Sequence, residues 1–255
     1  MAGFIAGVGV TLSEHFFSKG IDSLWENKER LSLFRKILLP KYRKQKIRFS
    51  ISYLFRIKIP TTNSYLLVMN RRIPNQLQPV GGAYKRYGDD SLFESWGYQP
   101  DKKSNGLGTD SISENDLRFF VSGKNVIKVI KWFESGKERE CSGNREFTEE
   151  LIDTKILDKT TFEKIFYKHL SRHSSHLRWS DYHKCYEVLI YDIFELLPTN
   201  QQKEALVELA RVPMDINKGY AIVECEEIEQ LRLLSNRTQI AKIGEHTRFI
   251  INDKK

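Results

Sequence analysis

The stretch that most constrains this chain is residues 144–151, which read Asn-Arg-Glu-Phe-Thr-Glu-Glu-Leu. On a helix, residues three and four apart share a face, so this stretch projects three carboxylates together: Glu146, Glu149 and Glu150. Carboxylates that converge repel one another unless a cation lies among them, and Mg²⁺ and Mn²⁺ prefer oxygen ligands of this kind. The segment therefore predicts a metal-binding helix.

Arg145 and Glu149 are four residues apart, so on a helix the arginine can form an ion pair with this carboxylate and hold its side chain in place. The alternative is a solvated helix face, because runs of charge are common on protein surfaces. The order of residue types decides between the two interpretations, since a surface helix requires no particular order.

Residues 145–150 match the second half of the Nudix box, which reads R-E-hydrophobic-x-E-E. The first half of that box begins with a glycine turn after a strand, and Gly81 and Gly82, which follow Gln-Pro-Val, resemble that turn. The chain departs from the usual box because 62 residues separate Gly82 from Arg145, and because Ile152 stands where the box ends in glycine. A split box of this kind resembles the SMODS-associated Nudix domains, which are encoded beside bacterial cyclic-nucleotide-making CD-NTase enzymes in the CBASS anti-phage systems.

The resemblance runs from about residue 49 to the C-terminus and implies an α+β fold, a Nudix-type α/β/α sandwich around a mixed sheet. It implies an effector that hydrolyses a nucleoside diphosphate linked to another group, with Mg²⁺ or Mn²⁺ as cofactor. The implied catalytic residues are Arg145, Glu146, Glu149 and Glu150, of which the three glutamates hold the metal. The implied substrate-binding residues are Gly81, Gly82, Arg118 and Thr247. For Arg118, an exposed surface arginine is the alternative.

A second hypothesis is that the fold is a sensor, which binds a cyclic oligonucleotide or another signalling nucleotide without cutting it and signals through oligomerisation or the N-terminal helix. The broken first half of the box favours the sensor, whereas the intact carboxylates favour hydrolysis. The net charge of +8 suits a polyanionic ligand in either case. A nucleic-acid-binding module is not expected, because the chain carries no recognition motif.

Two parts of the chain are expected: a helical N-terminal extension over residues 1–45 and a Nudix-like domain over residues 46–255, with an insertion at about residues 83–140. Apolar residues recur at near-helical spacing over residues 4–25, which predicts an amphipathic helix. This helix is expected to pack on its own domain or on a second copy in a homo-oligomer. The alternative is a helix on a membrane surface, because a basic cluster follows over residues 41–48.

Three widely spaced cysteines with no CxxC motif indicate a reducing cytoplasm, with a peripheral position at the inner membrane as the alternative location. Alternation and apolar runs predict strands over residues 49–59, 65–69, 126–133, 186–197 and 219–225, and another that begins near residue 116. Helices are predicted over residues 160–170 and 202–210. If the first of these continues, three histidines share one face and offer a possible second metal site: His169, His173 and His176.

Overall fold

The computed structural model describes residues 22–88, 91–101 and 115–251. The amphipathic helix expected over residues 4–25 therefore lies almost wholly outside the described residues. Within the described part, no helix is both long enough and apolar enough to cross a membrane.

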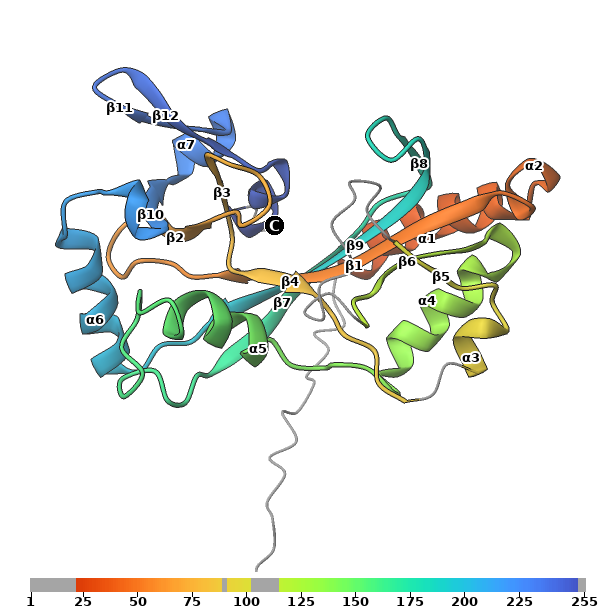
Figure 1. Cartoon of the computed structure of the whole chain (residues 1–255), viewed down its shortest axis with the longest axis horizontal. Coiled ribbons are helices and arrows are strands. Elements are labelled where there is room, and N and C mark those ends of the chain that lie inside the picture. Colours follow the sequence, from red (N-terminus) through yellow and green to blue (C-terminus); the bar gives the residue numbers. More distant parts are fainter. Residues whose placement is uncertain (1–21, 89–90, 102–114, 252–255) are drawn as a thin grey trace, which may run out of the picture.

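Within the described residues, seven strands form the larger of two mixed sheets (Figure 1). The main path runs through β5 (Gln99–Pro100), β6 (Arg118–Ser122), β1 (Lys46–Arg56), β9 (Cys185–Leu196) and β7 (Tyr167–Ser174). The short strand β4 (Gly81–Ala83) also pairs with β1, and β8 (Arg178–Ser180) pairs with β9. The central pair, β1 and β9, is parallel, and the other pairs are antiparallel. The α+β class with mixed sheets is confirmed.

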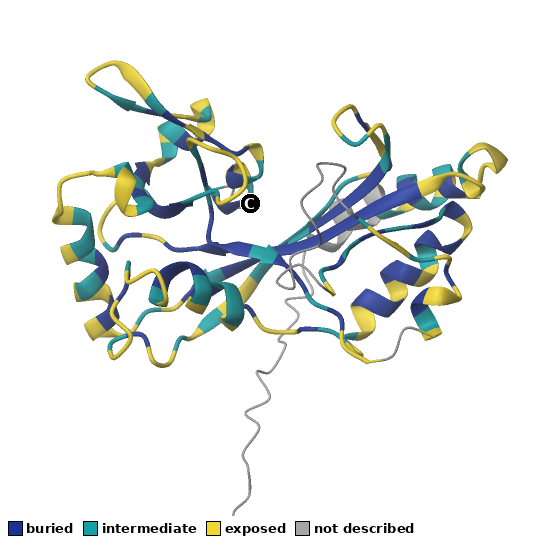
Figure 2. Cartoon of the chain, viewed as in Figure 1, coloured by how far each residue is buried: buried dark blue, intermediate teal, exposed yellow. Residues whose placement is uncertain are grey.

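Strand β1 explains why the core forms where it does. Its alternate residues Ile47, Phe49, Ile51, Tyr53 and Phe55 are all fully buried in the main apolar cluster. Because successive side chains of a strand point to opposite faces, this set packs one face of the sheet. Figure 2 shows β1 and β9 as a nearly continuous buried band through the middle of the molecule. The strand predicted over residues 49–59 is confirmed, with its start shifted to Lys46 and its end to Arg56.

The smaller sheet has the order β10 (Tyr220–Glu224), β2 (Ser64–Met69), β3 (Gln76–Gln78), β12 (Thr238–Ile243) and β11 (Arg232–Ser235). A second apolar cluster lies against it and includes Leu54 of β1 and Ile193 of β9. The ends of the two central strands thus belong to both clusters, which joins the two sheets.

The helices are α1 (Asp22–Leu38), α2 (Pro40–Arg43), α3 (Ser91–Glu94), α4 (Val126–Ser135), α5 (Asn144–Phe147), α6 (Asn200–Arg211), α7 (Cys225–Gln230) and α8 (Arg248–Ile251). Leu33 and Ile37 of α1 are buried in the main cluster, so this part of the N-terminal extension packs on its own domain. Helix α6 begins with a capping box formed by Thr199 and Gln202, and it confirms the helix predicted over residues 202–210.

Two predicted elements are wrong. Residues 126–133 form helix α4 rather than a strand, and Val126, Val129, Ile130 and Phe133 are buried along it. Residues 160–166 are turns and irregular chain rather than the start of a helix, and β7 begins at Tyr167. These corrections change which side chains can meet, because β7 carries two of the three histidines considered above.

Candidate functional site

The acidic segment forms a helix, as predicted, but with two kinds of turn. Helix α5 runs directly into a π-helical turn, Thr148–Ile152, in which the amide of Asp153 donates to the carbonyl oxygen of Thr148 at 2.9 Å. Phe147 and Leu151 are buried in the main cluster, so the opposite side of the helix presents its carboxylates. Single π-helical turns inside α-helices occur frequently at functional sites.

Arg145 joins this helix to strand β4, which lies beside it (Figure 1). Its Nη2 donates to the carbonyl oxygen of Ala83 at 2.8 Å, and its Nη1 donates to Glu146 Oε1 at 2.6 Å. The predicted contact with Glu149 is present as an ion pair at 3.7 Å. Arg145 therefore holds Glu146 more closely than Glu149, and it fixes the position of the whole helix relative to the glycine strand.

Glu140 is a site residue that the sequence analysis missed. Its side chain is only 4% exposed, and it accepts hydrogen bonds from Arg145 Nε at 3.2 Å and Nη2 at 3.1 Å. The backbone amide of Lys85 also donates to it, at 3.1 Å. The sequence contained one signal for this role. Glu140 lies five residues before Arg145, and a partly buried arginine needs an acidic partner.

The two glycines of β4 meet the carboxylates directly. The backbone amide of Gly81 donates to Glu150 Oε2 at 2.8 Å. At Gly82, a Cβ atom would lie 2.0 Å from Glu146 Oε1, so only glycine leaves room for this carboxylate. The two halves of the split box, 62 residues apart in the chain, are therefore in contact, as the resemblance implies.

The carboxylates are also close enough to influence one another. Glu150 is 7% exposed, and burial raises its pKa to about 8. The hydrogen bond from Gly81 opposes this shift, whereas the negative charges of Glu146 and Glu149 add to it. One buried and two partly buried carboxylates that repel one another are an oxygen donor set that suits Mg²⁺ or Mn²⁺.

Within the described part of the chain, no three His, Cys, Asp or Glu side chains are already grouped so that they could hold a metal ion. Glu146 and Glu150 lie against the glycine pair, whereas the side chain of Glu149 is 35% exposed and points less deeply into the site. The three carboxylates supply the oxygen ligands that a hard divalent cation prefers. Two of them, those of Glu146 and Glu150, lie against the glycine pair.

The other two predicted substrate-binding residues are Arg118 and Thr247, and they have different surroundings. Arg118 is the first residue of β6 and pairs with Asp116 at 3.2 Å, and the negative charge of Glu146 acts on its guanidinium. Its neighbour Leu117 donates a backbone hydrogen bond to Tyr84, the residue after β4. Thr247 is fully buried, and within the described residues its Oγ1 has no hydrogen-bond partner. Arg118 thus lies within the influence of the Glu146 charge, whereas no described hydrogen bond joins Thr247 to the carboxylates.

The histidine arrangement that a continued helix would give does not exist. A bulge in β7 places His169 beside Asp192 of β9, whereas His173 stacks on Phe249 of α8. Asp192 is buried and accepts two hydrogen bonds from Arg172, at 2.6 and 2.9 Å. These contacts explain His169 as a neighbour of the buried Asp192 carboxylate rather than as a metal ligand.

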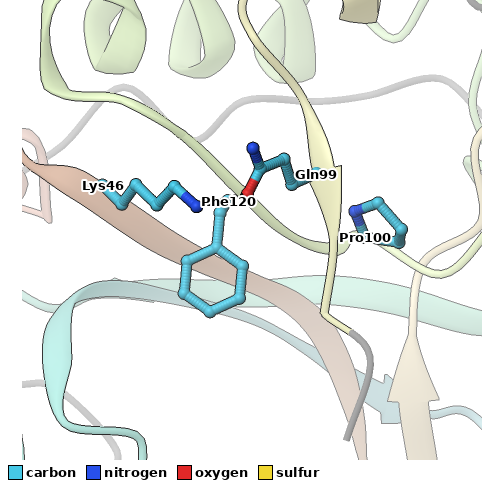
Figure 3. A pocket seen from close by; sticks show the side chains of 4 residues that line it. All are labelled: Lys46, Gln99, Pro100 and Phe120. Carbon is cyan, nitrogen blue, oxygen red and sulfur yellow. Dashed lines mark hydrogen bonds between the residues drawn. The ribbon is translucent and has the colours of Figure 1, made fainter.

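A surface hollow of about 330 Å³ lies at the far end of β1 from β4 (Figure 3). It is lined by Lys46, Gln99, Pro100 and Phe120, and Lys46 Nζ donates to Gln99 Oε1 at 2.5 Å. Its lining includes none of the carboxylates discussed above, so the candidate site is defined by the α5–β4 contacts and not by this hollow.

Comparison with known families places the chain in one of them over most of its length. The model of the SMODS-associated NUDIX domain matches residues 46–251, from the first residue of β1 to the last residue of α8. No curated protein and no solved structure matches the chain.

Proposed function

The chain belongs to the SMODS-associated NUDIX domain family, and we propose that it is a Mg²⁺- or Mn²⁺-dependent hydrolase of a nucleoside diphosphate linked to a second group. The observation that carries this proposal is the meeting of Glu146 and Glu150 at the glycine pair of β4. A structural surface helix would have no reason to place two carboxylates against adjacent glycines.

Glu146, Glu149 and Glu150 would hold the metal ion. When bound, such an ion neutralises charge on phosphoryl oxygens and makes a bound water more acidic. The chain's own residues prepare the site: Arg145 orients Glu146, and the absence of a side chain at Gly82 keeps space beside that carboxylate. Glu150 must lose its proton before it can bind a cation, because metal ligands bind in their deprotonated form.

The family name supports a place beside a cyclic-nucleotide-making enzyme in an anti-phage defence system. In that setting, hydrolysis would remove a nucleotide or a signalling molecule from the cell. A basic chain with a net charge of +8 is consistent with a phosphate-rich ligand.

A second candidate function is a sensor that binds a nucleotide without cleaving it. The observation that favours it is the position of Glu149, whose side chain is 35% exposed, so that only Glu146 and Glu150 are held at the glycine pair. The two functions differ in what the carboxylates do. A hydrolase requires Glu149 for turnover, whereas a sensor requires only that the ligand-binding surface stays intact.

The test is to incubate the purified protein with Mg²⁺ or Mn²⁺ and a panel of nucleoside-diphosphate compounds and cyclic di- and trinucleotides, and to follow products by chromatography. The hydrolase account predicts metal-dependent cleavage of at least one compound, which Glu149→Gln reduces by at least about a hundredfold. Glu163→Gln is the control, because Glu163 is an exposed carboxylate outside the site. Binding of a cyclic nucleotide without product from any compound would favour the sensor instead.

A further inference from the structure

The carboxylate helix, α5 with its π-helical turn, has no capping side chain at its own N-terminus. It follows Gly143, which has no side chain, and the amides of a first helical turn have no partners within the helix. Helices commonly satisfy one of these amides with a Ser, Thr, Asp or Asn side chain at the position that Gly143 occupies. Gly143 is buried, so its amide needs a partner from elsewhere in the protein.

Two tyrosine hydroxyls from the larger sheet accept hydrogen bonds from these amides. The amide of Gly143 donates to Tyr167 Oη at 2.9 Å, and the amide of Glu146 donates to Tyr53 Oη at 3.3 Å. Tyr167 is the first residue of β7, and Tyr53 lies within β1. The sheet therefore caps the helix at two of its first amides.

Ring packing holds both hydroxyls in place. The Tyr53 side chain is fully buried, and its ring centroid lies 4.8 Å from that of Tyr84 and 5.9 Å from that of Phe194. The Tyr167 centroid lies 5.1 Å from the same Phe194 ring. Both capping tyrosines thus belong to one aromatic cluster, and a hydroxyl on a closely packed ring has little freedom to move.

Helix α5 also packs directly on this cluster. A Cβ atom at Gly143 would lie 2.6 Å from the ring of Phe55, whose centroid is 5.2 Å from that of Tyr167. Phe147, the last residue of α5, packs on the same Phe55 ring with a centroid distance of 5.5 Å. The helix therefore cannot shift along the sheet without breaking both the ring contacts and the two hydrogen bonds.

Glu146 links the cap to the candidate metal site. Its amide is held by Tyr53, while its carboxylate accepts a hydrogen bond from Arg145 Nη1 at 2.6 Å and lies against Gly82. The backbone and the side chain of this residue are thus held by different groups. Groups that orient a metal ligand typically change metal affinity by a factor of roughly 10 to 100.

We propose that Tyr53 and Tyr167 are positioning residues of the carboxylate site, which cap α5 from the sheet and, through Tyr53, set the position of Glu146. Both act through the backbone of the helix. Their consequence for a cation rests on the proposed function, whereas the capping of the helix does not. The competing account is that the two hydroxyls only stabilise the fold, as other buried hydrogen bonds do.

Replacement of Tyr53 by Phe removes the hydroxyl and keeps the ring. Tyr84→Phe is the matched control, because Tyr84 is also buried, its ring contacts Tyr53, and its hydroxyl donates to Asp192 at 2.8 Å rather than to the helix. In Mn²⁺ titrations followed by electron paramagnetic resonance, Tyr53→Phe is expected to weaken binding roughly tenfold and to alter the spectrum of the bound ion. Tyr84→Phe is expected to keep the affinity and spectrum of wild type, whatever its melting temperature.

Hydrogen exchange of the helix amides, measured by mass spectrometry in the absence of metal, tests the capping itself. Tyr53→Phe and Tyr167→Phe are each expected to speed exchange over residues 143–150 by at least about fivefold, whereas Tyr84→Phe leaves it unchanged. Tyr167 is only partly buried, so its variant tests the cap with less effect on the core. Unchanged exchange in both capping variants, or the same change in all three proteins, overturns the proposal. Equal Mn²⁺ affinity in Tyr53→Phe and Tyr84→Phe overturns the role of Tyr53 toward Glu146.

The proposed function can fail separately. If wild type hydrolyses no compound and binds no Mn²⁺, faster exchange in the two capping variants still establishes the cap, and the hydrolase proposal alone fails. If hydrolysis depends on Glu149 but neither exchange nor Mn²⁺ binding changes in Tyr53→Phe, the positioning role fails and the hydrolase proposal stands.

Discussion

Arg145 donates a hydrogen bond from Nη2 to the carbonyl oxygen of Ala83 at 2.8 Å, and this bond joins two segments that are 62 residues apart in sequence. The same guanidinium contacts Glu140 and Glu146. One side chain thus assembles the site by linking the glycine strand, a buried carboxylate and the carboxylate helix.

Substitution of Arg145 by Gln should lower the free energy of unfolding by roughly 3 kcal/mol, because it leaves Glu140 buried without its cationic partner. Arg211→Gln is the control, since the Arg211–Glu208 pair is about 70% exposed and such pairs contribute roughly 0–1 kcal/mol. Urea denaturation of the two variants measures the difference. An equal loss in both would contradict the role given to Arg145.

Substitution by alanine should have different effects on stability and metal binding at the two glycines of β4. Gly82→Ala places a methyl group where the Glu146 carboxylate lies, and that flexible side chain can move aside. We expect a stability change below about 1 kcal/mol but at least a tenfold loss of metal binding. Gly81→Ala places its methyl group 2.1 Å from the Tyr53 backbone oxygen at a φ of 149°, so it should lower the free energy of unfolding by several kcal/mol, roughly 2 or more.

Thermal unfolding and Mn²⁺ titration of both variants check this prediction. A Gly82→Ala protein that binds Mn²⁺ as tightly as wild type would show that Glu146 is not held against the glycine for metal binding.

The raised pKa of Glu150 predicts a pH dependence of stability in the metal-free protein. Between its ordinary pKa of 4.5 and about 8, the folded state keeps a proton that the unfolded state has lost. The free energy of unfolding should therefore fall as pH rises through this window, by about 1.4 kcal/mol per pH unit, and level off above pH 8. Glu150→Gln should remove this component, whereas Glu163→Gln should retain it.

Urea denaturation in EDTA at several pH values from 5 to 9 measures this slope. Added Mg²⁺ should stabilise the protein more at pH 8 than at pH 6, because the cation must displace the Glu150 proton. Parallel pH profiles for wild type and Glu150→Gln would refute the assignment.

Local sequence patterns predicted the elements whose partners are near in the chain or whose two faces differ in chemistry. Both faces of β1 are buried, but large apolar side chains occupy one face while Arg48, Ser50 and Ser52 lie on the other, and this difference produces the alternation. Helix α6 begins at the Thr199–Gln202 capping box. Helix α4 was mispredicted as a strand because valine and isoleucine favour strands, although its buried residues recur at helical spacing.

Part of the candidate site was also predictable from local sequence. The carboxylates and glycines lie in short motifs, so sequence alone indicated that they would meet. Glu140 carries no such motif. Its role depends on where the segment before α5 comes to lie in the folded chain, which no local pattern specifies.

The most direct test of the central claim, that the carboxylate helix and the glycine strand form a divalent cation site, is Mn²⁺ binding followed by electron paramagnetic resonance at pH 8. The account predicts that wild type and Glu163→Gln bind Mn²⁺ alike, and that Glu146→Gln and Glu150→Gln each bind it at least about tenfold more weakly, because each removes an oxygen ligand. Equal affinity in all four proteins would contradict it.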